Sequence, residues 1–116
     1  MKRKCIYMKK RHAVIYQIKD IGSVDYAFRA FDPKKFSFKA YKKVYELDVD
    51  ASGKLYTDIL EELFSLFNDY FRRPADFEGH SMSVSDVVVL DGKAYYCDAF
   101  AWSNMGDINE VIRNYP

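Results

Sequence analysis

Cysteine, histidine and glycine are scarce in this chain of 116 residues, which has two cysteines, two histidines and five glycines. The cysteines, Cys5 and Cys97, are too few for a disulfide scaffold. Together with His12 and His80 they stand singly in the sequence, without the paired spacing of zinc ligands. The glycines form neither a phosphate-binding loop nor a dinucleotide fingerprint. We therefore expect no structural disulfide, no metal site and no small-molecule cofactor.

Long apolar runs are also missing. The basic start at residues 1–4 is not followed by an apolar region of the length that an export signal has. No stretch approaches the roughly 20 apolar residues that a membrane helix requires. We expect no membrane association and a cytoplasmic location.

Aromatic residues are abundant instead, with ten tyrosines and nine phenylalanines, and 49% of the residues are hydrophobic. A chain of this length is enough for one domain with its own core. Residues 1–10 show no periodicity and predict a flexible basic tail. Residues 11–116 predict a single α+β domain.

Hydrophobic periodicity predicts the main elements. Residues 12–19 alternate as a strand does, residues 36–49 favour extended structure with lysines suited to a sheet edge, and residues 26–31 are ambiguous between a helical turn and a short strand. The clearest helix is predicted from Thr57 to Tyr70, with Asp58 or Thr57 as its N-cap. Its apolar stripe comprises Leu60, Leu63, Phe64, Phe67 and Phe71.

The strongest local signal is a β-hairpin, because Asp91-Gly92 lies between the apolar runs 84–90 and 93–100. Its register places Val87 opposite Tyr96, Val88 opposite Tyr95 and Val89 opposite Ala94. A run that is apolar on both faces belongs at the centre of a sheet. Residues 102–106 predict a loop, after which Asp107 caps a short helix with Ile108, Val111 and Ile112 facing inward. The expected fold is a small antiparallel sheet with a C-terminal hairpin and one main helix packed on one face.

Charge is divided unevenly along the chain. Residues 1–46 hold 13 basic and 4 acidic side chains, whereas residues 47–116 hold 5 basic and 13 acidic ones. Either the basic residues contact an anionic partner, or they lie over the acidic half of the same chain. Interleaved with aromatic residues, they favour single-stranded nucleic acid as the alternative partner. This basic patch comprises Lys9, Lys10, Arg11, Lys34, Lys35, Lys39, Lys42 and Lys43.

The segment from Gly79 to Asp86 (GHSMSVSD) gathers an imidazole, three hydroxyls and a carboxylate before a buried strand. One interpretation is a small hydrolase, with His80 as general base, Ser81 or Cys97 as nucleophile, and Asp98 or Asp86 orienting the base. The other is structural, since short hydroxyl side chains satisfy backbone groups where a loop enters a sheet. Adjacent residues in a strand point to opposite faces, so His80 and Ser81 are not expected to meet. We therefore expect no catalytic activity, and the hydrolase is the second alternative.

A protein-binding face is the remaining candidate. Trp102, the single tryptophan, lies close in sequence to Met105 and Phe100. Tryptophan is a frequent anchor of protein interfaces. It serves equally well as a plug that closes a core, and both interpretations stay open.

Three segments carry a resemblance to a known family: Asn68, the run from Pro74 to Leu90, and the run from Tyr95 to Asp98. They resemble the YodL-like domain, with the GHSMSVSD segment as the most specific feature, over residues 12 to 101. The chain departs from the family in the short Asp91-Gly92-Lys93 connection and in having Ala101-Trp102 where relatives tend to have glycine near position 101.

The resemblance implies an accessory or regulatory module without an established enzymatic activity. It also implies carriage on bacterial chromosomes, plasmids and conjugative elements, which suggests interference with a host or defence-system protein. The sequence thus predicts a non-enzymatic module that has no cofactor and binds a protein partner. The predicted binding residues are Trp102, Met105, Phe100, His80, Ser81 and Asp86.

Overall fold

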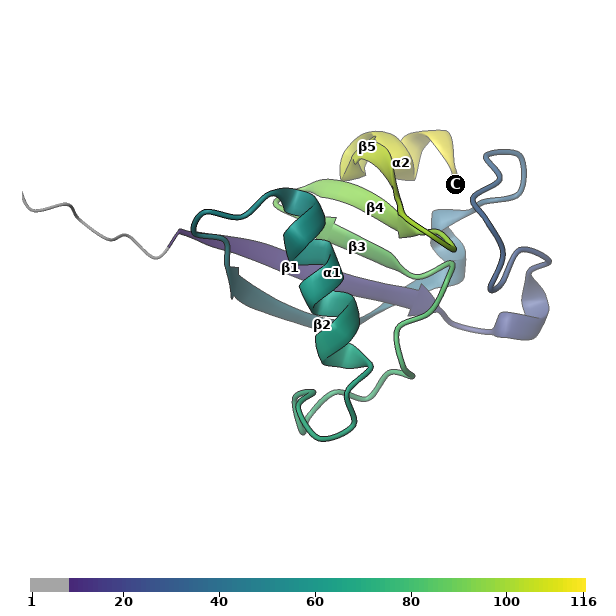
Figure 1. Cartoon of the computed structure of the whole chain (residues 1–116). Coiled ribbons are helices and arrows are strands. Elements are labelled where there is room, and N and C mark those ends of the chain that lie inside the picture. Colours follow the sequence, from purple (N-terminus) through teal and green to yellow (C-terminus); the bar gives the residue numbers. More distant parts are fainter. Residues whose placement is uncertain (1–8) are drawn as a thin grey trace, which may run out of the picture.

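The computed structural model describes residues 9–116, and in this range the chain forms one antiparallel sheet with strand order β2-β1-β3-β4-β5 and two α helices (Figure 1). The strands are β1 (Lys10–Ile18), β2 (Tyr41–Asp50), β3 (Val87–Leu90), β4 (Lys93–Cys97) and β5 (Trp102–Asp107). The helices are α1 (Tyr56–Phe67) and α2 (Ile108–Asn114), and the short 3-10 helices are η1 (Ile21–Ser23) and η2 (Phe38–Ala40). The expected α+β fold is confirmed.

The β3–β4 hairpin has the predicted register, with Val87 opposite Tyr96 and Val88 opposite Tyr95. Asp91 and Gly92 have φ values of 48° and 83°. Positive φ at both central residues is what a type I′ turn requires. The hairpin also lies where its apolar run indicates, because β3 is the central strand of the five.

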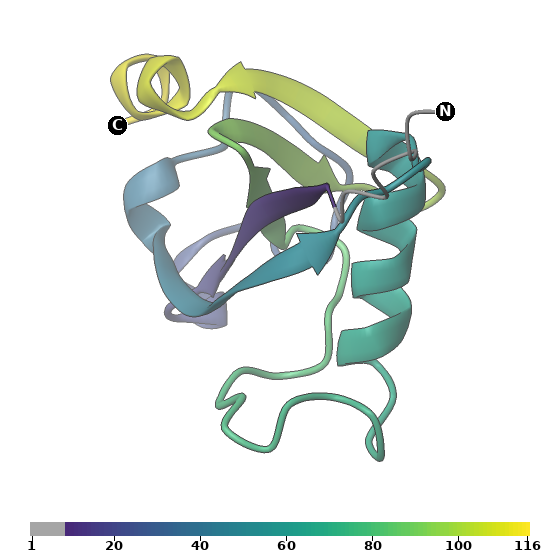
Figure 2. The same ribbon diagram turned by 90° about the vertical axis from the view of Figure 1, so that its left-hand side faces the viewer.

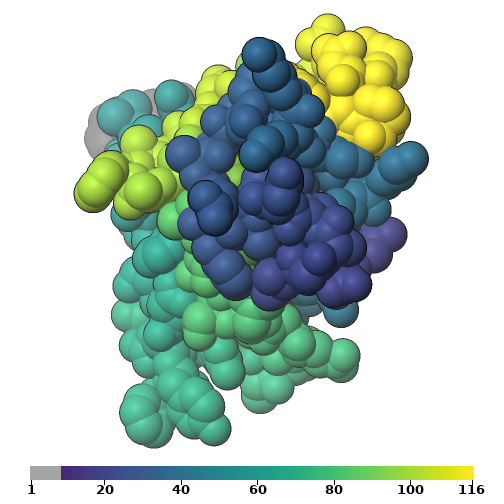
Figure 3. Space-filling model, turned by 90° about the vertical axis from the view of Figure 1, so that its right-hand side faces the viewer, coloured from purple at the N-terminus to yellow at the C-terminus, as the bar shows by residue number. Residues whose placement is uncertain are grey.

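Both faces of the sheet are buried at its central strand β3 (Figure 2). The helix α1 covers one face, and this first core comprises Ala13, Ile15, Leu60, Leu63, Phe67, Val88 and Leu90 among others. Residues 24–41 and α2 cover the other face, and this second core comprises Tyr26, Phe36, Tyr41, Val87, Val89, Tyr96 and Val111 among others. Figure 3 shows the segment between β1 and β2, in dark blue, spread over this side of the molecule.

The second core explains the high aromatic content. Phe36 contacts the rings of Tyr26, Phe31, Tyr41 and Tyr96, at centroid distances between 5.3 and 5.8 Å. Aromatic pairs in such edge-to-face and tilted arrangements stabilise a core beyond the area they bury. Large rings thus fill the space under a segment that has little regular structure.

The strands differ from the sequence-based expectations in four places. The hairpin strands are shorter than the runs 84–90 and 93–100, because β3 spans Val87–Leu90 and β4 spans Lys93–Cys97. β1 begins at Lys10, two residues earlier than expected, and the backbone N–H of Lys9 already donates to the Ser52 hydroxyl at 2.9 Å. The remainder of the predicted tail, residues 1–8, lies outside the described residues. β2 begins at Tyr41, because residues 38–40 form η2 rather than strand. Residues 102–106 belong to a strand, β5, so the prediction of a loop there is wrong.

The segment at residues 26–31 is neither a strand nor a helical turn, but an irregular turn. Phe28 has a φ of 64°, in the left-handed region that disfavours both regular structures for such a residue. Its backbone N–H donates to Ser85 Oγ at 3.1 Å, which fixes the turn against the loop before β3.

The ends of the helices also differ in part. The N-cap of α1 is Leu55, and Asp58 lies one turn inside, where its carboxylate accepts from the Leu55 N–H at 3.0 Å. α1 ends at Phe67, so Phe71 falls outside the apolar stripe and is 94% exposed. In α2 the predicted cap is confirmed, since Asp107 accepts from the Asn109 N–H. Ile112 is exposed rather than inward-facing.

Neither helix in residues 9–116 has the length and apolar composition needed to cross a bilayer.

Candidate functional site

The side chain of Gln17 organises the GHSMSVSD segment. It follows Ala13 and Ile15 on the same face of β1, and it is 1% exposed. Its Nε2 donates to the backbone carbonyl of His80 at 2.9 Å and to Asp86 Oδ2 at 3.0 Å, and its Oε1 accepts from the His80 N–H at 3.1 Å. A buried amide needs such partners, because an unpaired one costs free energy. Gln17 therefore fastens the loop to the sheet.

Two further residues of the segment are held by packing and backbone geometry. A Cβ on Gly79 would lie 2.4 Å from Gln17 Oε1 and 2.7 Å from the Phe77 ring, so only glycine fits there. Ser85 has a φ of 85°, and its carbonyl accepts from the Tyr41 hydroxyl at 2.6 Å. These contacts support the structural interpretation of the segment.

Asp86 is 2% exposed and belongs to the same network. Its Oδ2 accepts from the Ser83 N–H at 2.9 Å as well as from Gln17. Burial raises the pKa of this carboxyl to about 6, against the opposing effect of the two hydrogen bonds. Asp86 is thus enclosed by the fold and offers no surface to a partner.

Among residues 9–116, no hydrogen bond joins the side chains of the residues proposed for hydrolysis, although Asp86 and Cys97 are paired through their backbones. His80 and Ser81 are exposed, and His80 Nδ1 lies 2.7 Å from the backbone carbonyl of Ser81, not from its hydroxyl. Because a carbonyl only accepts, Nδ1 carries the proton in this contact. Cys97 is 3% exposed, and burial raises the pKa of its thiol to about 12.

Asp98 has a different task from the one the hydrolase hypothesis gives it. Its Oδ1 accepts from the Phe31 N–H at 2.7 Å, its Oδ2 accepts from the Ser103 hydroxyl, and its own N–H donates to the Ala101 carbonyl at 2.9 Å. Together these bonds fix the four-residue turn between β4 and β5. Phe100 lies in that turn and is fully exposed. Figure 3 shows the turn, in yellow-green, projecting from the outline of the molecule.

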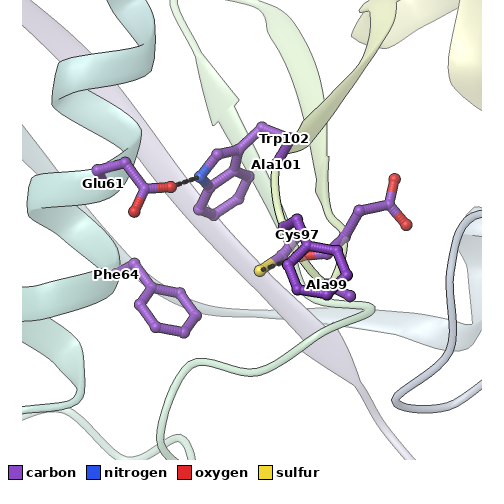
Figure 4. Close-up of a pocket in the computed structure, with 8 residues that line it drawn as sticks. Glu61, Phe64, Cys97, Ala99, Ala101 and Trp102 are labelled. Carbon is purple, nitrogen blue, oxygen red and sulfur yellow. Dashed lines mark hydrogen bonds between the residues drawn. The ribbon is translucent and has the colours of Figure 1, made fainter.

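Trp102 and Phe100 both line a small hollow of about 110 Å³. Figure 4 shows Trp102, Glu61 and Phe64 around it. The indole of Trp102 packs on the first core and its Nε1 donates to Glu61 Oε2 at 2.8 Å. Phe64, one turn further along α1, lines the same hollow. We call the set Glu61, Phe64, Phe100 and Trp102 the Phe100 corner. The fold thus brings two of the predicted binding residues together with two from α1.

Met105, which we grouped with Trp102 from the sequence, packs on the second core. The two residues therefore lie on opposite faces of β5 and form no common surface. The sequence did not indicate this, because residues 102–106 lack the alternation of a strand. Glu61 and Phe64 were also missed as site residues, although their position beside the apolar stripe of α1 is visible in the helical period.

Comparison with known proteins confirms the family resemblance that the GHSMSVSD segment indicates. The model of the YodL-like domain family matches residues 12–108. The chain belongs to this family. A relative within it, the uncharacterized protein YodL of Bacillus subtilis (strain 168), is 33% identical over 79 residues, which are 64% of this chain and 74% of the relative. No solved structure matches this chain significantly.

In this YodL-like domain the predicted basic patch is divided. Lys10 lies opposite Asp50 at one end of the β1–β2 pair, and Lys42 lies opposite Gln17 at the other. Seven residues of strand separate Lys10 from Gln17, a distance of about 23 Å. Three of the cations already have carboxylate partners, namely Arg11 with Asp91, Lys35 with Asp25 and Lys43 with Glu46.

Two other hollows in this YodL-like domain are open and have both cations and anions in their linings. One of about 500 Å³ lies beside the stacked rings of Tyr56 and Tyr95. Its lining contains the cations Arg11, Lys54 and Lys93, of which Arg11 and Lys54 pair with Asp91 and Glu62. The other, of about 310 Å³, lies beside His80. Its lining includes Lys19, Lys42, Asp20 and Glu78, two cations and two anions. The second hollow therefore favours no ligand of one charge, whereas the lining of the first contains more cations than anions.

Proposed function

We propose that this YodL-like domain is a non-enzymatic protein-binding module whose contact surface is the Phe100 corner. The observation on which this rests is the complete exposure of Phe100 beside a hollow walled by Trp102 and Phe64. A phenylalanine that a folded chain leaves in water loses the favourable free energy of burial. That free energy is recovered when a partner covers the ring.

The corner is also rigid before any partner arrives. The turn that holds Phe100 is fixed by three hydrogen bonds of Asp98, and the indole of Trp102 is oriented by Glu61. A surface that is already ordered loses less conformational entropy on binding. Rigid aromatic anchors of this kind are typical centres of protein interfaces.

The size of the hollow favours a protein over a small molecule. Sites for drug-sized ligands and cofactors enclose roughly 300–1,000 Å³, several times the volume of this hollow. About 110 Å³ suits one apolar side chain of a partner. We infer that a partner inserts such a side chain between Trp102 and Phe64 while it covers Phe100.

The absence of catalysis is part of the proposal. It is supported by the burial of Cys97, by the contact of His80 with a carbonyl rather than a hydroxyl, and by the use of Asp98 to fix a turn. The proposal extends to the kind of partner, a protein of the host cell or of its defence systems, as the carriage of related domains on mobile elements suggests.

The experiment is affinity capture from bacterial lysate with the tagged chain, at low and high salt, followed by mass spectrometry. Three chains are compared: the wild type, Phe100→Ala, and the control Phe71→Ala. Phe71 is 94% exposed and lies in another loop, so the control removes an equally exposed ring elsewhere. We expect a stoichiometric protein that survives high salt with the wild type and the control, and is lost with Phe100→Ala.

Other outcomes separate the alternatives. Loss with Phe71→Ala and retention with Phe100→Ala would place the contact surface in the loop after α1. Captured nucleic acid that high salt removes would favour the divided basic residues as the binding site instead. If a protein is captured as proposed, the purified partner should bind the wild type with a dissociation constant at least about tenfold lower than that for Phe100→Ala. This corresponds to a difference in binding free energy of about 1.4 kcal/mol.

A further inference from the structure

The outer edge of β2 is the longest free strand edge in the described part of the chain. β2 is ten residues long, about 33 Å, and within residues 9–116 it pairs only with β1 (Figure 2). A strand at the edge of a sheet presents unpaired backbone donors and acceptors that can pair with another chain. The side chains that flank this edge therefore decide which chain fits it.

Along β2 the charges form two blocks of opposite sign. Lys42 and Lys43 lie in the first half, and the second half contains Glu46, Asp48 and Asp50. A bulge places Lys43 on the same face as the three acidic residues, because Val44 is an extra residue in the register between Tyr45 and Lys43. The partners on β1 are Tyr16 for Lys43, Val14 for Glu46, His12 for Asp48 and Lys10 for Asp50.

These side chains are held at the surface. Lys43, Glu46 and Asp48 are 54, 43 and 60% exposed. The imidazole of His12 lies 2.7 Å from Glu46 Oε2 and 2.9 Å from Asp48 Oδ1, which fixes the direction of both carboxylates. Lys43 donates to Glu46 at 2.6 Å, and its ammonium group retains further donors.

We propose that β2 pairs with β2 of a second copy of this chain, antiparallel about a two-fold axis near residue 45 or 46. Antiparallel pairing sets the first half of one strand against the second half of the other. Lys43 of each copy then faces Glu46 or Asp48 of its partner on the same face of a continuous ten-stranded sheet. Cross-strand pairs of opposite charge stabilise such pairing, and like charges oppose it.

The same pattern excludes the competing arrangement. Parallel pairing in register would set each residue opposite the same residue of the second copy. Lys42 and Lys43 would then face Lys42 and Lys43, and Asp48 would face Asp48, so that like charges meet along the whole edge. Charges thus prevent open-ended stacking of this edge but permit one closed dimer. The dimer leaves the Phe100 corner free, because β5 lies at the opposite edge, four strand spacings or about 19 Å from β2.

Charge exchange tests the dimer. Sedimentation velocity is measured on the full chain at low salt, at protein concentrations from low micromolar to about 1 mM. The samples are the wild type, Lys42→Glu/Lys43→Glu, Asp48→Lys/Asp50→Lys, and an equimolar mixture of the two variants. We expect a concentration-dependent dimer of the wild type, and for each variant alone a dissociation constant raised by at least about tenfold, which is about 1.4 kcal/mol. The mixture should form a one-to-one heterodimer, because one edge is then acidic and the other mostly basic.

The matched control is Lys34→Glu/Lys35→Glu, an adjacent lysine pair outside β2 with the same change of net charge. It should dimerise as the wild type does, and so should Phe100→Ala. Circular dichroism checks folding, and the single variants Lys43→Glu and Asp48→Lys replace any double variant that unfolds. Any of three results overturns the proposal: the wild type stays monomeric at all concentrations, both charge-reversal variants dimerise as tightly as the wild type, or the mixture does not form a heterodimer.

Discussion

Gln17 and His80 are 63 residues apart in sequence, yet the buried amide of Gln17 bonds both the N–H and the carbonyl of His80. The same amide reaches Asp86, so one side chain supports the loop from both ends. Replacement of Gln17 by leucine would leave two backbone groups of His80 without this partner and would remove one of the two hydrogen bonds to the Asp86 carboxylate. Each buried polar group left unpaired costs about 1–3 kcal/mol.

We therefore expect Gln17→Leu to lower the free energy of unfolding by about 3 kcal/mol, as measured by urea denaturation. His80→Ala is the control, because it removes an exposed side chain and keeps both backbone bonds. Its effect should stay within about 0.5 kcal/mol. Equal effects of the two substitutions would contradict the role of Gln17.

Gly79 provides a second test of the same loop. An alanine Cβ would lie 2.4 Å from Gln17 Oε1, with the Phe77 ring on its other side, so the loop must shift. We expect Gly79→Ala to destabilise the fold by about 2 kcal/mol. In Gly22→Ala the nearest atom is an ordinary 3.6 Å away, so this control should be close to neutral in the same denaturation measurement.

Local chemistry explains which parts of this fold are predictable. Asp91-Gly92 specifies its turn through backbone geometry alone, and the four apolar residues of β3 specify a central strand. The lysines at 42 and 43 indicate an edge, and β2 is indeed an edge strand. In each case the information lies within a few residues of the feature that it determines.

The missed features depend on distant partners instead. β5 contains Ser103, Asn104 and Gly106, which favour turns, and it is a strand because β4 pairs with it. Gln17 looks like a polar interruption of an apolar face until its partners at His80 and Asp86 are known. For the same reason Trp102 and Met105 could not be assigned to opposite faces. The structural interpretation of the GHSMSVSD segment was available from its hydroxyl side chains, but the role of Gln17 in holding it was not.

The buried carboxyl of Asp86 should make stability depend on pH. Burial raises its pKa from 3.8 to about 6, so the folded chain binds this proton more tightly than the unfolded chain does. The resulting stability is fully present below about pH 4 and is lost as the pH rises through about 6. A rise of this size corresponds to about 3 kcal/mol.

We expect the free energy of unfolding of the wild type to fall by about 3 kcal/mol between pH 4 and pH 7, relative to Asp86→Asn. The comparison between the two chains removes the contribution of His12, whose pKa is raised by Asp48 and Glu46 in both. Urea denaturation at intervals of pH gives both curves. Parallel curves would show that Asp86 keeps an ordinary pKa in the folded chain.

Cys97 tests whether the Phe100 corner contains a reactive group. Its sulfur lines the hollow but is nearly inaccessible, and burial raises the pKa of the thiol to about 12. At pH 8 only about one molecule in ten thousand would carry the thiolate, which is the reactive form. In the Cys5→Ser chain, an aromatic disulfide reagent should therefore label no thiol in native buffer and one thiol in denaturant. Rapid labelling of the native chain, abolished by Cys97→Ser, would instead place a nucleophile beside Phe100 and Trp102, and the hydrolase alternative would regain its strongest residue.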